Sequence, residues 1–185
     1  MSTAKTLFWK HGFKRVSVEE ICREAGVSKM TFYKYFSNKL ELVKEILDVI
    51  FKESMDEFRR LMHADIPFEE KMKRQIQMKL EGTRDISEEF VKDIYGDPDS
   101  ELNAVWRKKS DEAIAVVIEL YREAQEKGYL RQDLKIDFIL YMINKAFEFV
   151  NDDTLISKYD HMQDLILEIN RFFLYGILPH EQTDD

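Results

Sequence analysis

The chain of 185 residues has few of the residues that interrupt helices or form cross-links and metal sites. Its one cysteine excludes an internal disulfide and any multi-cysteine metal site. It has three prolines and six glycines, and its apolar runs are only a few residues long. No run is long enough for a membrane span or for a secretory signal, so we expect a cytoplasmic protein without a membrane partner.

Motifs of catalysis are also missing. The histidines at 11, 63, 161 and 180 stand singly, and there is no Gly-rich phosphate loop, Gly-x-Ser-x-Gly or Cys–His pairing. The paired acids at 152–153 and 184–185 are typical of a loop and a tail. Cys22 fits a small, half-buried position better than a redox switch. We therefore expect no enzyme, and we predict no catalytic residue, metal ligand or cofactor.

Helical patterns fill the rest of the chain. Apolar residues recur three and four positions apart between the glycines and prolines, and no convincing run alternates in the manner of a strand. The sequence predicts an all-α protein of about nine helices. They are expected at about 3–10, 18–25, 28–36, 39–63, 67–81, 87–95, 98–127, 136–150 and 162–175.

Helix boundaries near the N-terminus are marked by capping residues. Ser17 with Glu20 and Asn38 with Glu41 have the spacing of capping boxes, so a helix is expected to begin after each. Gly26 is expected to end the helix before it, because glycine adopts positive φ without strain. A very short helix should follow this turn.

Charge is distributed unevenly along the chain. Residues 1–47 carry nine Lys or Arg and five Glu, a net charge of +4, whereas the rest carries −12, which gives −8 for the whole. A basic N-terminal segment on an acidic body suggests an acidic partner for that segment. Ordinary drift of surface charge is the alternative.

The short helix at 28–36 has two different faces. At 100° per residue Phe32, Tyr35 and Phe36 fall on one side, which we expect to be buried. The opposite side centres on Met30 and Lys34. Two helices joined by a Gly turn, the second with such a face, predict a helix-turn-helix whose second helix enters the DNA major groove.

The exposed residue types suit DNA. Lysine donates to guanine O6 and N7, methionine and threonine contact the thymine methyl, and hydroxyls bind phosphate. The alternative is that lysine and tyrosine merely solvate a short helix.

Residues 7–47 resemble the N-terminal domain of the tetracycline-repressor (TetR) family of transcriptional regulators. The matching positions are Phe8, Gly12, Phe13, Ser17, Val18, Ile21, Ala25, Gly26, Val27, Ser28, Thr31, Phe32, Tyr33, Tyr35, Phe36, Asn38 and Lys39. The resemblance implies a three-helix DNA-binding domain at 1–47 and an effector-binding and dimerisation domain at 48–185.

The resemblance also implies residue roles. Phosphate contacts are expected from Ser17, Lys29, Thr31, Tyr33 and Lys39, and base contacts from Met30 and Lys34, with Ser28 as the cap that completes the DNA-binding set. Two features depart from the family. Many members have Gly at the position of Met30, and only six residues precede Leu7, which makes an N-terminal arm short.

The last two predicted helices are apolar on more than one side, so one core face cannot use all of their apolar residues. A homodimer bundle is favoured over a deeply buried central helix, and the family resemblance implies the same. The predicted dimer residues are Ile139, Ile143, Phe147, Leu165, Ile169, Phe172 and Phe173.

As a set, the methionine and aromatic residues of the body could line an adaptable apolar cavity for a small effector, although ordinary core packing is the favoured explanation for each of them taken singly. The predicted effector-binding residues are Met72, Ile76, Met78, Tyr95, Trp106, Tyr121, Phe138, Tyr141 and Met142. We expect a repressor that binds a palindromic operator as a homodimer and is released by a small molecule. A helical protein-interaction adaptor is the alternative.

Overall fold

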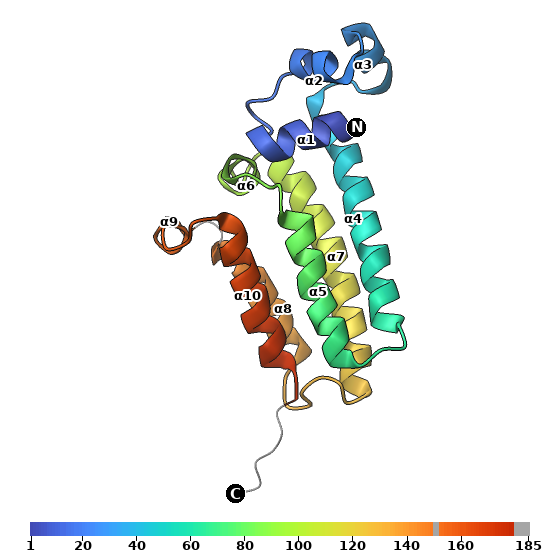
Figure 1. Cartoon of the computed structure of the whole chain (residues 1–185), viewed down its shortest axis with the longest axis vertical. Helices are drawn as coiled ribbons and strands as arrows, with labels where there is room; N and C mark the ends of the chain where they lie inside the picture. Colours follow the sequence, from blue (N-terminus) through green and yellow to red (C-terminus); the bar gives the residue numbers. More distant parts are fainter. Residues whose placement is uncertain (150–151, 180–185) are drawn as a thin grey trace, which may run out of the picture. The chain divides into compact units, whose positions relative to one another are not determined.

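The computed structural model describes residues 1–149 and 152–179, leaving aside the side chains of Asn144 and Phe147. Over these residues the chain is helical and contains no strand (Figure 1), which confirms the predicted all-α class. The helices are α1 Ser2–His11, α2 Val18–Ala25, α3 Lys29–Tyr35, α4 Lys39–His63, α5 Phe68–Thr83, α6 Glu88–Tyr95, α7 Glu101–Glu126, α8 Ile136–Phe149, α9 Asp153–Ile156 and α10 Met162–Ile177.

Nine of these helices correspond to the predicted ones, and the four-residue α9 was not expected. The pair Asp152 and Asp153, interpreted from the sequence as a loop, begins this helix. The side chain of Asp152 accepts hydrogen bonds from the backbone N–H groups of Thr154 and Leu155, at 2.9 and 3.1 Å. An N-terminal cap therefore explains this acidic residue.

The chain divides into two compact units. Unit 1 contains Met1–Ser54 and Thr83–Asp111, and unit 2 contains Met55–Gly82 and Glu112–Asp185. Unit 1 thus adds α6 and the start of α7 to the predicted DNA-binding segment 1–47. The functional division at residue 47 stays a prediction.

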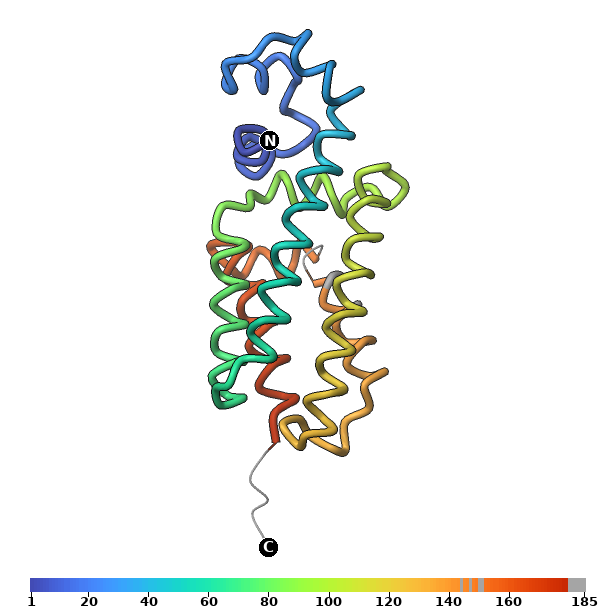
Figure 2. The backbone as a smooth tube through the Cα atoms, turned by 90° about the vertical axis from the view of Figure 1, so that its right-hand side faces the viewer, coloured from blue at the N-terminus to red at the C-terminus, as the bar shows by residue number. Residues whose placement is uncertain are grey.

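The core of unit 1 joins the first four helices to α6. Its buried residues include Phe8, Val16, Ile21, Phe32, Leu42, Leu47 and Phe90. Figures 1 and 2 show α6, in green, beside α1, in blue. The rings of Trp9 and Phe90 lie 4.4 Å apart, and the Ser87 N–H donates to the carbonyl oxygen of Trp9 at 2.8 Å. Helix α6 is therefore part of the framework that supports the N-terminal helices.

The core of unit 2 gathers residues from α4, α5, α7, α8 and α10. Its buried members include Phe58, Met72, Tyr121, Ile139 and Leu174. Tyr121 carries a polar group into this core, and its hydroxyl accepts a hydrogen bond from Gln75 Nε2 at 3.0 Å. Burial raises the pKa of Tyr121 to about 12, so the phenol stays neutral at physiological pH.

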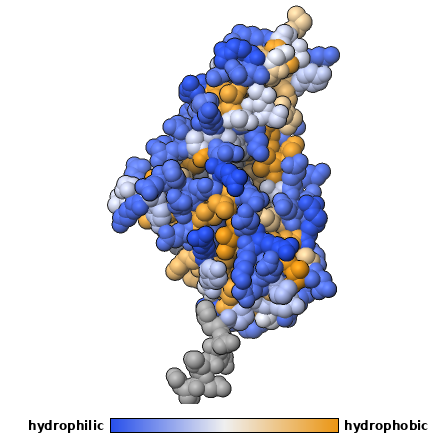
Figure 3. All heavy atoms as spheres, in the orientation of Figure 1, coloured by the Kyte–Doolittle hydropathy of each residue, from blue (hydrophilic) through white to orange (hydrophobic). Residues whose placement is uncertain are grey.

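The molecular face in Figure 3 is mostly hydrophilic, with apolar patches between the charged side chains. Within residues 1–149 and 152–179, no helix combines the length and the apolar character that a bilayer span requires.

Gly12 is the position where backbone geometry constrains the sequence most. It ends α1 with φ 81°, and its N–H donates to the carbonyl oxygen of Phe8 at 2.9 Å. A Cβ at this position would lie 2.7 Å from the Asp93 Oδ2 atom of α6. Both the positive φ and the close approach of Asp93 therefore require glycine.

We predict that Gly12→Ala lowers the melting temperature by roughly 3–10 °C, because a strained φ and a displaced Asp93 together cost about 1–3 kcal/mol. Gly82→Ala is the matched control. Gly82 lies in α5 with no atom within 4 Å of the added Cβ, so this change should leave the melting temperature unchanged or slightly higher. Differential scanning calorimetry of both variants measures the effect, and equal melting temperatures would contradict it.

Candidate nucleic-acid interface

The turn between α2 and α3 is formed by local hydrogen bonds that the sequence encodes. Ser17 caps α2 by accepting from the Glu20 N–H at 3.1 Å. Gly26 ends α2 in the left-handed conformation with φ 67°, and the Val27 N–H donates to the Cys22 carbonyl at 3.0 Å. This hydrogen-bond pattern satisfies the last carbonyls of α2 and directs the chain into α3. The predicted capping and Gly turn are confirmed.

Helix α3 begins at Lys29 and is capped by Ser28. The Ser28 Oγ accepts from the Thr31 N–H at 3.0 Å and lies 2.9 Å from the Thr31 hydroxyl. Phe32 is the buried side chain of this helix, with 5% exposure, and its ring lies 5.6 Å from that of Phe36. One aromatic anchor thus holds the inner side of the helix.

The outer side of α3 faces solvent. Met30 is 84% exposed and Tyr33 is 55% exposed, and Thr31 and Lys34 are exposed as well. Tyr35 is 69% exposed, and its predicted place on the buried side is wrong. Tyr35 is the last residue of α3, and the 100° spacing gives the side of the helix on which it lies but not whether another element covers that side.

Tyr35 is therefore a candidate DNA contact that the sequence analysis missed. The Lys34 ammonium lies 5.9 Å from the centre of its ring, so a cation and a phenol are presented together. A tyrosine hydroxyl can donate to phosphate. No spacing in the sequence indicated this exposure, because it depends on which elements pack against α3.

Lys29 already has a partner within the chain. Its ammonium forms an ion pair with the Glu19 carboxylate in the first turn of α2, and both side chains are more than half exposed. The hydrogen bond to Glu19 raises the pKa of Lys29, and the same bond lowers the pKa of Glu19. Because an exposed pair of this kind contributes little to stability, a phosphate could compete with Glu19 for the lysine.

Lys39, predicted as a phosphate contact, is bound to the chain's own backbone. Its ammonium donates to the carbonyl oxygens of Phe13 and Val16 at 2.6 and 2.7 Å, and to that of Lys14 at 3.3 Å. It also lies 4.4 Å from the Phe13 ring centre. These three carbonyls match the three N–H donors of an ammonium. Lys39 therefore fixes the loop between α1 and α2.

Burial lowers the pKa of Lys39, and the Asp93 carboxylate opposes this shift. Asp93 holds the same loop from α6, because its Oδ2 accepts from the Lys14 N–H at 2.8 Å. The ammonium also stands next to the start of α2, since Val16 precedes the cap Ser17. An anion at that helix start would therefore meet both a positive helix end and a nearby cation.

The structure thus brings together most of the predicted DNA-binding set. The residues whose side chains are exposed are Ser17, Ser28, Lys29, Met30, Thr31, Tyr33 and Lys34. The ion pair between Lys29 and Glu19 places the start of α3 beside the first turn of α2. Lys39 differs in being partly buried with its donors in use.

The predicted effector-binding residues fall in different units. Tyr95 and Trp106 belong to unit 1, where Trp106 Nε1 donates to the Tyr95 hydroxyl at 2.8 Å. The others belong to unit 2. There Met72 and Tyr121 are buried and Ile76, Met78 and Met142 are half-buried, whereas Phe138 and Tyr141 are 53% and 57% exposed.

The predicted dimer residues are also divided between core and surface. Ile139 and Leu165 are each 1% exposed, so they pack inside their own unit. Ile143, Ile169 and Phe173 are half-buried, and Phe147 lies outside the side chains that the structure describes. Phe172 is 81% exposed. The exposed aromatic residues of α8 and α10 are Phe138, Tyr141, Phe149, Phe172 and Tyr175, and only Phe172 among them was predicted as a dimer residue.

No group of three or more His, Cys, Asp or Glu side chains is placed to hold a metal ion in the part of the chain that the structure describes.

The N-terminal segment is similar to a known family. Residues 1–46 match the family model of the bacterial regulatory proteins, tetR family. The chain is 31% identical over 81 residues to YhgD of Bacillus subtilis, named an HTH-type transcriptional regulator, and this match covers 44% of the chain and 42% of YhgD. It is 23% identical to the B. subtilis HTH-type regulator YdgC, with 97% of the chain and 91% of YdgC covered. The match to YhgD thus spans less than half of that protein.

Solved structures share the fold over nearly the whole chain. The fatty acid degradation regulator FadR of Bacillus halodurans superposes with a TM-score of 0.70 at 21% identity, covering 95% of this chain and 92% of its own. A transcriptional regulator from Saccharomonospora viridis in complex with choline has a TM-score of 0.72 at 17% identity, covering 97% and 95%. FadR of B. subtilis in complex with stearoyl-CoA has a TM-score of 0.68 at 15% identity, covering 96% and 98%.

We predict that Lys39→Met lowers the free energy of unfolding by about 1–3 kcal/mol, because it leaves partly buried carbonyls without a donor. Lys34→Met is the control. Its side chain is exposed and outside the loop, so stability should change by less than about 0.5 kcal/mol. Guanidinium unfolding followed by circular dichroism measures both. If the two variants unfold at the same midpoint, the bonds of Lys39 do not stabilise the loop.

Proposed function

We propose that this chain, whose residues 1–46 match the family model of the bacterial regulatory proteins, tetR family, is a transcriptional repressor that binds a palindromic operator as a homodimer. A small molecule bound by the rest of the chain would release it. The single observation that carries this proposal is the orientation of α3, in which Phe32 is 5% exposed and Met30 is 84% exposed.

The side chains of α3 have separate tasks in this proposal. Met30 and Lys34 lie on the outer side and read base edges, methionine by apolar contact with thymine and lysine by hydrogen bonds to guanine. Tyr33 and Thr31 donate hydroxyl hydrogen bonds to phosphates, which fix the register of the helix in the groove. Lys29 adds a phosphate contact by leaving Glu19. Tyr35 joins the predicted set as a further phosphate contact.

Lys39 acts indirectly in this scheme. It holds the backbone at 13–16 and so places Ser17 and the start of α2, where unpaired N–H groups favour a phosphate. Its effect on DNA affinity would therefore pass through the loop.

Homodimerisation is supported by the exposed aromatic residues of α8 and α10. Large aromatic side chains are the ones most enriched at the centres of protein interfaces. A two-fold dimer would present two copies of α3, and an operator with half-sites one helical turn apart, about 34–36 Å, would match them.

Effector release is the part of the proposal that the related structures motivate. Two proteins of this fold are described in complex with choline and with stearoyl-CoA, compounds of very different size and charge, so the fold does not specify the ligand. A ligand that prefers the conformation with low DNA affinity would shift the population away from the operator-bound form. Gel-shift titration of the operator with candidate ligands tests this step.

We predict that DNA binding weakens steeply with salt, with a slope of log K against log salt near −0.9 for each phosphate neutralised.

Lys34→Ala and Met30→Ala should change which sequences are selected from a random DNA pool, whereas Tyr33→Phe should weaken binding to all sequences alike. Fluorescence anisotropy across a salt series and sequencing of the selected DNA measure both effects. Salt-independent binding, or no selection of a palindrome, would favour the adaptor interpretation.

We also predict that Phe172→Glu converts the dimer to a monomer, because the carboxylate would be buried without a partner in the interface. Val49→Glu is the control, since Val49 is 43% exposed on α4 and belongs to unit 1. Analytical ultracentrifugation reports the mass of each variant. A Phe172→Glu variant that keeps the mass of the unaltered protein would exclude this face as the interface.

A further inference from the structure

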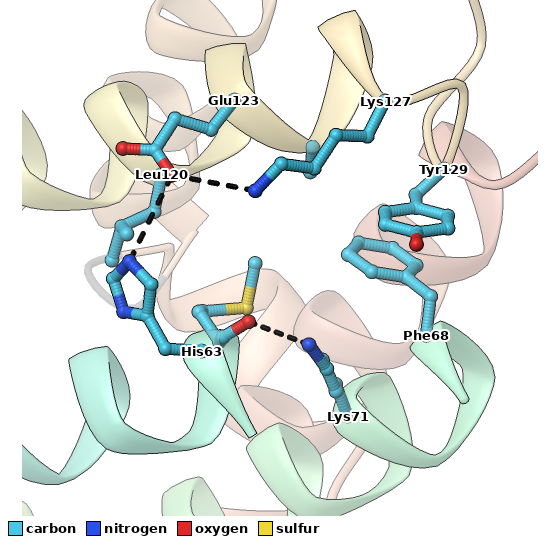
Figure 4. A pocket seen from close by; sticks show the side chains of 9 residues that line it. His63, Phe68, Lys71, Leu120, Glu123, Lys127 and Tyr129 are labelled. Atoms are coloured by element: carbon cyan, nitrogen blue, oxygen red, sulfur yellow. Dashed lines mark hydrogen bonds and ion pairs between the residues drawn. The ribbon is translucent and has the colours of Figure 1, made fainter. Parts of the chain in front are cut away.

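Unit 2 contains a pocket that the sequence analysis did not anticipate. Its volume is about 250 Å³, and it lies where the end of α4, the start of α5 and the end of α7 meet (Figure 4). None of the nine predicted effector-binding residues lines it. Polar side chains from three helices line it, which makes it a candidate binding site for a polar or charged ligand.

Lys71 is the most unusual residue of this pocket. The residue is 8% exposed, although lysine is rarely buried without a partner. Its ammonium donates to the Met62 carbonyl oxygen at 2.6 Å, and two further N–H donors remain. Among the residues that the structure describes, no carboxylate forms an ion pair with it. A buried ammonium in this position has the capacity to bind an anion.

Lys127 provides a second cation directed at the same space. Figure 4 shows the ammonium groups of Lys71 and Lys127 pointing into the pocket from opposite sides. Lys127 Nζ lies 3.8 Å from Glu123 Oε2, and His63 Nε2 lies 3.8 Å from the same oxygen. Both separations exceed hydrogen-bond length. The carboxylate therefore forms no hydrogen bond with either group, and an incoming anion could replace it beside Lys127.

Two aromatic rings complete the pocket. Phe68 and Tyr129 are stacked, with ring centres 5.3 Å apart and planes at 13°, and they form its right-hand wall in Figure 4. Such a wall favours a ligand with an apolar, flat part next to its charge.

We propose that this pocket binds a small organic carboxylate. Its two lysines outnumber its one glutamate, although residues 48–185 as a whole carry −12. A cation would be repelled by both ammonium groups. The carboxylate would accept hydrogen bonds from Lys71 and Lys127, while its apolar part contacts Phe68 and Tyr129. A volume of about 250 Å³, below the range of about 300–1,000 Å³ usual for drug-sized ligands, limits the ligand to a small one.

Isothermal titration calorimetry on the full chain without DNA tests the proposal, so its result does not depend on whether the protein is a repressor. Benzoate is the probe, benzamide is its uncharged isostere, and inorganic phosphate is an anion without an apolar part. We expect saturable binding of benzoate at one site per chain, and at least tenfold weaker binding of benzamide and of phosphate. Equal binding of benzoate and benzamide, preferred binding of a cation such as choline, or phosphate binding as tight as benzoate would overturn the proposal.

Substitutions assign the binding to this pocket. Lys71→Met should weaken benzoate binding at least tenfold, because it removes the buried donor. Lys73→Met is the matched control from the same helix, since Lys73 is exposed, pairs with Glu69 and does not line the pocket. It should bind benzoate as the unaltered chain does. If both lysine variants bind equally, the site lies elsewhere.

Glu123→Gln gives a test in the opposite direction. It removes the anion that competes for Lys127, so benzoate should bind several-fold more tightly. The side chain of Glu123 is 43% exposed, and the change should not disturb folding, which keeps the proposal open to refutation even if Lys71→Met fails to fold. Weaker or unchanged benzoate binding to Glu123→Gln would contradict the arrangement proposed here.

Discussion

A seven-residue helix does not hold its shape alone in water, and the candidate DNA-binding surface depends on overcoming this limit. Isolated helices shorter than about 12–15 residues are marginal, and α3 has seven residues. Its order comes from the Ser28 cap, from the left-handed turn at Gly26 and from the burial of Phe32. All three lie at its start or on its inner side, so Met30, Tyr33 and Lys34 stay free to meet a ligand.

The lysines around this helix differ in how far the chain already uses them. Lys29 pairs with Glu19 at the surface, where an ion pair contributes little to stability and exchanges easily. Lys39 is different, because its partly buried ammonium donates hydrogen bonds to three backbone carbonyl oxygens. A phosphate could thus replace Glu19 as the partner of Lys29 at little cost. If a phosphate bound Lys39 instead, the carbonyl oxygens of the loop would lose their hydrogen-bond donor. Two lysines with the same predicted role therefore have different physical constraints.

Local signals in the sequence predicted most of the fold, and the features that they missed depend on tertiary contacts. Capping boxes at Ser17 and Asn38 and the glycine at 26 located α2, α3 and α4, since these residues act on their own neighbours. Tyr35 was predicted to be buried because a helical period gives the side of the helix on which a residue lies, but not whether another element covers that side. The bonds of Lys39 and the pocket around Lys71 join segments far apart in the chain, and no spacing in the sequence encodes them.

Two side chains from other helices hold the loop between α1 and α2, which leads into the candidate DNA-binding surface. Lys39 holds its carbonyls from α4, and Asp93 holds the Lys14 N–H from α6, so a displacement of α6 or of the start of α4 would move the backbone that leads to Ser17. In the proposed switch, a hundredfold loss of operator affinity requires a ligand that prefers the released conformation by the same factor, about 2.7 kcal/mol. Linkage then requires operator DNA to weaken ligand binding a hundredfold. In the proposed switch the loop would carry this coupling, because it contacts both elements and directly precedes the capped start of α2.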